Sequence, residues 1–182
     1  MLWPWLGIVM VLGTLPRCGS AQPASPYVGQ EQQEIKALSA EDIHGYLSGS
    51  GMGLAKVAEL HHYPGPRHVL DLAQPLQLTE EQQRHTQAIF EAMHTKAVRV
   101  GQQLLDQERH LDALFAAGTI TEAQVEHLVA AIATTHGHLQ VVHLRAHLAQ
   151  KPILTLDQLR RYDMLRGDEM SRPHTTHPQH GH

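Results

Sequence analysis

The chain has one cysteine, Cys18, among its 182 residues. A single thiol cannot form an internal disulfide, and it cannot supply the paired thiolates of a cysteine zinc site. Aromatic residues make up only 4% of the chain, so the apolar share is mainly aliphatic and favours helix-packing seams over a thick core. The formal charge is −4. Because no basic excess is available to neutralise phosphates, we expect no nucleic-acid partner.

Recognisable catalytic patterns are also missing. We find no combination of nucleophile, base and orienting group, and no phosphate-binding loop. Residues 49–53 are rich in glycine, but no predicted strand precedes them, as a dinucleotide loop would require. We therefore expect neither an enzyme nor a required cofactor.

The one long apolar run lies at the start of the chain, over residues 1–15. It is short for a membrane span, and the small residues before Gln22 suit a cleavage site after Ala21. Residues 1–21 therefore predict a secretory signal peptide, a periplasmic protein and no stable membrane insertion after cleavage. A lipoprotein anchored at Cys18 is the less favoured alternative, because Arg17 stands where a small residue is needed.

Histidine is the residue in excess, with sixteen copies. Full protonation would change the formal net charge from −4 to +12, since −4 + 16 = +12. Imidazole titrates near neutral pH, so the charge of this chain is unusually sensitive to pH between about 5 and 7.

Residues 78–117 predict one long helix. Thr79 and Gln82 form a capping box at its start, no proline interrupts it, and Gly118 follows it. Apolar residues recur at alternating steps of three and four, as on one face of a helix. They are Phe90, Met93, Ala97, Val100, Leu104, Leu111 and Leu114.

A second capping box, at Thr121 and Gln124, predicts another helix from Glu122 to about Gln150. Its seam is Val125, Leu128, Ile132, Thr135, Leu139, Val142, Ala146 and Ala149. Two such helices with a short connection are expected to fold as an antiparallel hairpin. Gly101 and Gly137 fall at the same level of the two arms, which suggests either a shared bend or accidental placement on exposed faces.

The remaining segments predict an all-α fold, with short helices on both sides of the hairpin. Residues 22–53 form a polar lead-in with one short helix after Ser39, and residues 54–167 form the helical domain. Residues 168–182 form a polar, histidine-rich tail that we expect to be disordered. The short helices are predicted at residues 54–60, at residues 67–73, and from Leu154 to Leu165, with Gly167 as the stop of the last one.

Two short motifs flank the predicted hairpin, and their members are Leu78, Thr79 and Gln82, and Leu154, Thr155 and Gln158. This pair resembles the LTxxQ family of periplasmic proteins, which includes the Spy/CpxP chaperones and related heavy-metal sensors. The resemblance covers roughly residues 54–167.

The resemblance implies a four-helix protomer that dimerises into a curved cradle. It implies an ATP-independent chaperone or envelope-stress accessory protein, whose partners are unfolded envelope proteins or an envelope stress sensor. The alternative is a heavy-metal sensor or metal buffer on the same fold. Chaperone members have markedly basic cradles, whereas this chain is slightly acidic, so electrostatic capture of acidic clients is not expected at neutral pH.

Histidines supply the candidate metal ligands. His143 and His147 are four residues apart, so both project from one face of a helix, and hairpin register places His94 on the facing flank. Together they could bind Zn²⁺, Cu²⁺ or Ni²⁺, or they could be ordinary surface histidines. In the sensors that the chain resembles, such a pair is joined by ligands from near the N-terminus, a role that the resemblance gives to His44, His61 or His62. The tail offers a second, flexible group: His174, His177, His180 and His182.

Three apolar residues lie off the main seam: Ile89, Leu105 and Phe115. They are the candidate client-binding residues, on a concave apolar patch. The alternative for each is packing in the hairpin or in a dimer.

Overall fold

The computed structural model describes residues 25–170. The predicted signal peptide, Cys18 and the four tail histidines lie outside these residues. Residues 25–31 belong to a separate unit and form turns, in which the amide of Val28 donates to the carbonyl of Ser25. Every helix lies in residues 32–170, and the described part of the chain contains no strand. The predicted all-α fold is therefore confirmed.

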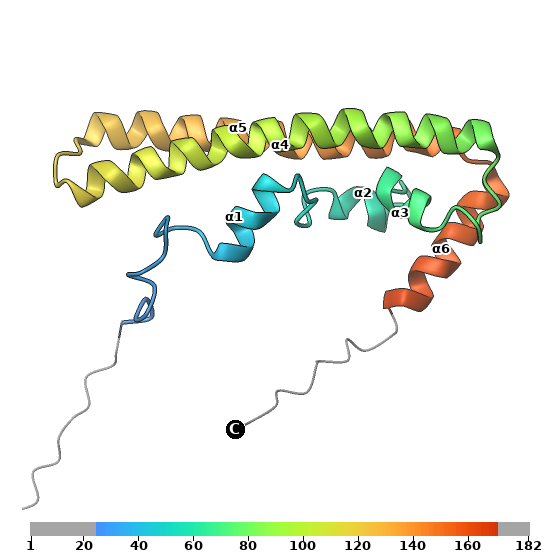
Figure 1. The fold of residues 1–182 in the computed structure, drawn as a ribbon, viewed down its shortest axis with the longest axis horizontal. Coiled ribbons are helices and arrows are strands. Elements are labelled where there is room, and N and C mark those ends of the chain that lie inside the picture. Colours follow the sequence, from blue (N-terminus) through green and yellow to red (C-terminus); the bar gives the residue numbers. More distant parts are fainter. Residues whose placement is uncertain (1–24, 171–182) are drawn as a thin grey trace, which may run out of the picture. The chain divides into compact units, whose positions relative to one another are not determined.

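The hairpin consists of α4 (Glu80–Ala116) and α5 (Glu122–Gln150), which pack antiparallel along their length (Figure 1). Both helices begin with the predicted capping boxes. The Thr79 hydroxyl accepts from the Gln82 amide at 3.1 Å, and the Thr121 hydroxyl accepts from the Gln124 amide at 3.4 Å. The predicted helix bounds and the antiparallel pairing are confirmed.

Gly118 ends the first arm with a φ of +65°. Glycine adopts this left-handed conformation without a steric penalty from a Cβ atom. The next amide, that of Thr119, then donates back to the carbonyl of Leu114 at 3.3 Å. This local geometry turns the chain into α5.

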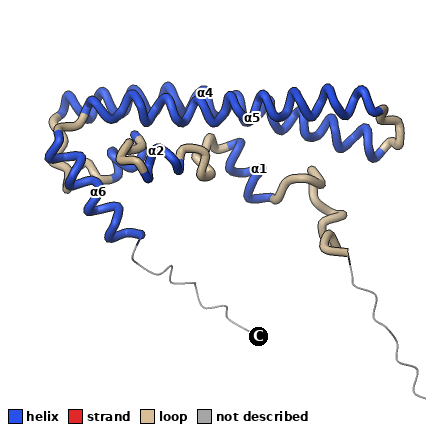
Figure 2. Tube along the Cα trace, turned by 180° about the vertical axis from the view of Figure 1, so that it is seen from behind, coloured by secondary structure: helices blue, strands red, loops and turns tan. Residues whose placement is uncertain are grey.

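Three short helices pack along one side of the hairpin: α1 (Ala40–Leu47), α2 (Lys56–Leu60) and α3 (Pro66–Asp71) (Figure 1; Figure 2 shows the same side from behind). The backbone of α1 approaches α4 so closely that a Cβ on Gly101 would overlap the carbonyl oxygen of Tyr46. Nothing lies near the corresponding position of Gly137. Gly101 is therefore explained by helix contact, and no shared bend is needed to account for it.

After α5, the 3₁₀ turn η1 (Lys151–Ile153) leads into α6 (Leu156–Met170). The prediction that Gly167 stops this helix was wrong, because α6 continues through it. Glycine costs only about 1 kcal/mol inside a helix, and Gly167 does not take the positive φ that a stop requires. α6 closes a core cluster at the base of the hairpin, formed by Val69, Leu76, Leu78, Leu154 and Tyr162.

The predicted hairpin seams describe only part of the burial. Ala97 and Leu104 on α4, and Leu139 and Ala146 on α5, are buried as expected, but Ala149 is exposed. In its last two turns α5 instead buries polar residues, namely His143, His147 and Gln150. The α2 and α3 helices also contact α5, so a second face of α5 is covered there.

No helix in the described residues is both long and apolar enough to cross a membrane.

Candidate functional site

Polar side chains are concentrated where α2, α3 and α6 meet the end of α5. The side chain of Glu59, on α2, lies at the centre and is 21% exposed. One of its oxygens, Oε1, accepts from Nδ1 of His68 at 2.8 Å and from the amide of Gly65 at 3.2 Å. The other oxygen, Oε2, accepts from the hydroxyl of Tyr162 at 2.8 Å. We call Glu59, Gly65, His68, His147 and Tyr162 the Glu59 cluster.

The turn between α2 and α3 gives this cluster its geometry. Residues 63–66 form the sequence Tyr-Pro-Gly-Pro, and the two prolines restrict the backbone. Gly65 lies so close to the cluster that a Cβ there would come within 2.9 Å of both Glu59 Oε1 and His147 Cε1. A side chain at this position would therefore displace the carboxylate or the imidazole.

His147 is buried, and its Nδ1 lies 2.8 Å from the carbonyl oxygen of Tyr63. A carbonyl can only accept, so Nδ1 carries the proton in this bond. In a neutral ring, Nε2 then keeps its lone pair. His147 Nδ1 also lies 4.0 Å from Glu59 Oε1, so the carboxylate faces both histidine rings.

His143, one turn earlier on α5, is 3% exposed. Its Nε2 is fully buried and has no hydrogen-bond partner. Burial, followed by the charge of His147, lowers the pKa of His143, which favours a neutral imidazole. A buried polar atom without a partner is rare in folded proteins and often marks the place of a ligand or ordered water.

The charge of Glu59 is stabilised despite its burial. Burial alone raises the pKa of this carboxyl group, but hydrogen bonds from His68 and Tyr162 and the charges of His68 and His147 together lower it below its ordinary value. Burial and the Glu59 carboxylate raise the pKa of the Tyr162 hydroxyl, which therefore stays protonated and donates. The cluster thus combines one carboxylate with one phenol and two imidazoles.

Two pockets open at this place, with volumes of about 540 Å³ and about 290 Å³. Three imidazoles, those of His68, His143 and His147, line both of them. Glu59 and Tyr162 line the larger pocket, and His94 lines the smaller one. Such pockets with a few convergent polar groups are typical of ligand sites.

The predicted set His94, His143 and His147 is therefore brought to the wall of one pocket. His94 differs from the other two, because its Nε2 donates to the carbonyl oxygen of Ser48 at 3.1 Å and its ring packs on Phe90. In residues 25–170, no three His, Cys, Asp or Glu side chains already stand at ligand distance from one point.

The three candidate client-binding residues lie in different environments. Phe115 is 58% exposed near the hairpin turn and Ile89 is half-buried. Leu105 is 0% exposed, so the structure removes it from any client surface. The buried face of α4 is wider than the predicted seam, because it includes Leu105 as well as Leu104.

Glu59, His68 and Tyr162 were missed by the sequence prediction. The available signal was the rigid Tyr-Pro-Gly-Pro turn, with an acidic residue before it and a histidine after it. Tyr162 gave no local signal, since it is more than a hundred residues from Glu59 in the chain.

Comparison with known proteins found no matching family model, no similar curated protein and no similar solved structure.

Proposed function

We propose that the protein binds a divalent transition-metal ion through His143 and His147, and that it works in the periplasm as a metal sensor or buffer. One observation carries the proposal: the two imidazoles are buried side by side on α5, with one Nε2 left without a partner and the other ring fixed by the Tyr63 carbonyl. Imidazoles in their neutral form are the usual ligands for Zn²⁺, Ni²⁺ and Cu²⁺.

Calorimetric titration with Zn²⁺, Cu²⁺ and Ni²⁺ tests this function. The four tail histidines, His174, His177, His180 and His182, are first replaced by asparagine, because a histidine-rich segment binds metals by itself. We expect one ion per chain in this background. We expect binding to be lost in His143→Gln and in His147→Gln, and to be retained in His136→Gln, a control at an exposed position on the same helix.

Equal binding by all three variants would contradict the proposal. Loss of helicity in a variant is checked by circular dichroism, so that unfolding is not mistaken for the loss of a ligand. The tail histidines are tested in the same way, by comparing the parent chain with the asparagine background.

A second candidate function, an ATP-independent chaperone for unfolded envelope proteins, is supported by a different observation. The hairpin leaves large apolar side chains in solvent, among them Phe115, Val129, Val141 and Leu148. Exposed apolar groups of this kind could hold an unfolded chain. The LTxxQ resemblance supports the same function, together with a cradle-shaped homodimer and an envelope stress sensor as a further partner.

The chaperone function is tested by the aggregation of a chemically unfolded model protein in the presence of a chelator. We expect the metal-free protein to suppress aggregation, and Phe115→Ser to weaken this effect. His110→Ser, at another exposed position on α4, serves as the control. Light scattering measures the mass of the assembly, for which we expect twice that of one chain.

A further inference from the structure

We propose that His68 is the third ligand of a three-histidine metal site with His143 and His147, and that Glu59 is the carboxylate that positions its ring. This inference rests on the proposed metal-binding function and specifies its site. It replaces His94 in the predicted set by a residue from a different helix, α3.

The hydrogen bond between His68 and Glu59 determines which nitrogen of His68 can bind a metal. The carboxylate oxygen accepts from Nδ1 at 2.8 Å, so in the neutral ring the proton is on Nδ1 and the lone pair is on Nε2. A carboxylate behind a histidine, bonded to the ring nitrogen that does not face the metal, is the common outer-shell arrangement of histidine metal sites.

His147 has the same arrangement with a different acceptor. Its Nδ1 donates to the Tyr63 carbonyl, so its Nε2 is also the nitrogen with the lone pair. His143 contributes a buried Nε2 that has no partner. Each of the three rings therefore has a nitrogen suited to a metal ion, and all three rings line the same two pockets.

Two nearby groups are less suitable as ligands. Both oxygens of Glu59 already accept hydrogen bonds, from His68 and Gly65 on one side and from Tyr162 on the other. His94 donates from Nε2 to the carbonyl of Ser48, so only its Nδ1 keeps a lone pair, and it lines only the smaller of the two pockets. Binding a metal through Glu59 would break existing hydrogen bonds, whereas the Nε2 atoms of His68 and His147 take no part in the bonds that their Nδ1 atoms make.

Binding requires a small rearrangement, since no three ligand groups in the described residues are yet gathered around one point. His68 is the residue best able to move. Its side chain is 40% exposed on a helix of only six residues, while His143 and His147 are buried in the hairpin. We expect metal binding to draw the His68 ring toward α5.

The ligand set indicates the class of metal. Three neutral imidazoles with water at the fourth position suit Zn²⁺, Ni²⁺ and Cu²⁺ rather than Mg²⁺ or Ca²⁺, which prefer oxygen ligands.

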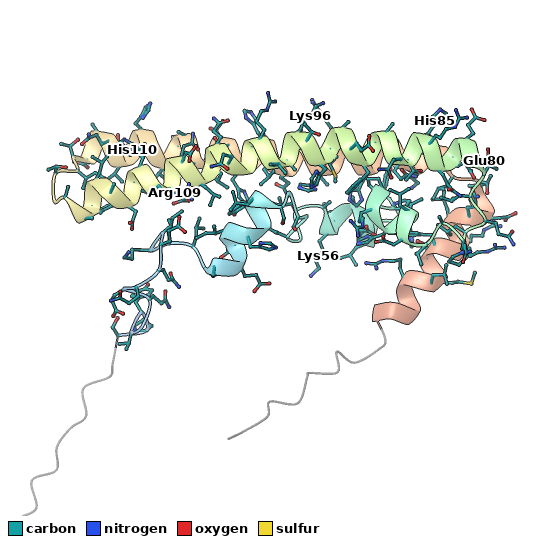
Figure 3. The ribbon with its side chains drawn as sticks, viewed as in Figure 1. Lys56, Glu80, His85, Lys96, Arg109 and His110 are labelled. Carbon is teal, nitrogen blue, oxygen red and sulfur yellow. The ribbon has the colours of Figure 1, made fainter. Side chains whose placement is uncertain are left out.

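The decisive variant is His68→Gln in the background without tail histidines. Glutamine keeps an amide that can donate to Glu59, but it offers no imidazole nitrogen. His85→Gln is the matched control, because His85 is exposed on α4 and points away from the short helices (Figure 3). We expect the Kd for Zn²⁺ to rise in His68→Gln by more than the about 10–100-fold that the loss of an outer-shell partner costs, and to stay unchanged in His85→Gln.

X-ray absorption of the zinc-loaded protein gives a readout that a purely structural role of His68 would not change. We expect three imidazoles around zinc in the background protein and two in His68→Gln. Glu59→Gln keeps the three imidazoles but weakens Zn²⁺ binding about 10–100-fold, as removal of an outer-shell carboxylate typically does.

The outcomes separate the two proposals. If His143→Gln abolishes binding while His68→Gln binds zinc like His85→Gln, with the same imidazole count, His68 is not a ligand and the metal-binding function still stands. If the background protein binds none of the three ions, both proposals are overturned.

Discussion

The side-chain amides of Gln82 and Gln158 bond to each other in both directions. Gln82 Nε2 donates to Gln158 Oε1 at 2.8 Å, and Gln158 Nε2 donates back to Gln82 Oε1 at 3.0 Å. Each amide also reaches a backbone carbonyl on the other side, that of Ile153 for Gln82 and that of Leu76 for Gln158. The two LTxxQ motifs therefore join the starts of α4 and α6.

This pair predicts a measurable coupling energy. Gln158→Ala removes a hydrogen-bond partner of the Gln82 amide and of the Leu76 carbonyl in a partly buried place, so we expect a loss of about 1–3 kcal/mol in the free energy of unfolding. We expect the double variant with Gln82→Ala to lose less than the sum of the two single losses. Urea denaturation measures all three. Gln87→Ala, at an exposed position of α4, is the control and should change stability by less than about 0.5 kcal/mol. If Gln87→Ala destabilised the protein as much as Gln158→Ala, the Gln82–Gln158 pair would have no specific role in stability.

Replacement by alanine should change the stability of the protein in opposite directions at Gly101 and at Gly137, which lie at the same level of the two arms. Gly101→Ala forces a methyl group against the Tyr46 carbonyl, so we expect it to destabilise the protein by about 1–3 kcal/mol, as overpacking usually does. Gly137→Ala meets no neighbouring atom and should stabilise the helix by about 1 kcal/mol. Thermal and urea unfolding of the two variants test this, and equal shifts would show that the α1–α4 approach is not as close as described.

The Tyr162 hydroxyl should stabilise the Glu59 cluster. Tyr162→Phe keeps the buried ring but removes the donor to a buried carboxylate, and hydrogen bonds to charged groups contribute about 1.5–3 kcal/mol. We expect a loss of that size in urea denaturation. Tyr63→Phe is the control, because it keeps the ring under the Lys151 ammonium group; if it costs as much, the hydroxyl of Tyr162 has no special role.

The start of α1 should show a simple pH dependence. The side-chain and backbone hydrogen bonds from Ser39 lower the pKa of Asp42 below its ordinary value. Because the folded-state pKa is the lower one, this contribution is present above the unfolded pKa and is lost as the pH falls through the folded pKa. NMR titration should show the pKa of Asp42 rising in Ser39→Ala. An unchanged value would mean that the capping box does not form in solution.

The helices were predictable because their signals are local. Thr79 and Gln82, or Thr121 and Gln124, lie three residues apart, and the hydrogen bonds of a capping box form within that distance. Gly118 likewise acts through its own backbone angle. Gly167 shows the limit of such signals, since a glycine permits a helix stop without requiring one.

The candidate site depended on contacts between distant segments. The spacing of His143 and His147 could be read from the chain, but their burial follows from α2 and α3 packing on a second face of α5. The prediction that Leu105 contacts clients failed for a similar reason. How many positions of a helix are buried depends on every helix that packs against it, and Leu105 is buried.

The sequence by itself determined the class of fold, the bounds of the two long helices and their reversal at Gly118, since each of these is decided by bonds between near neighbours. Only the tertiary structure decided that Glu59 meets His68 and Tyr162, and that His68, His143 and His147 line the same two pockets. A hydrogen bond across a hundred residues leaves no periodic pattern in the chain, because it exists only after the short helices have packed against the hairpin.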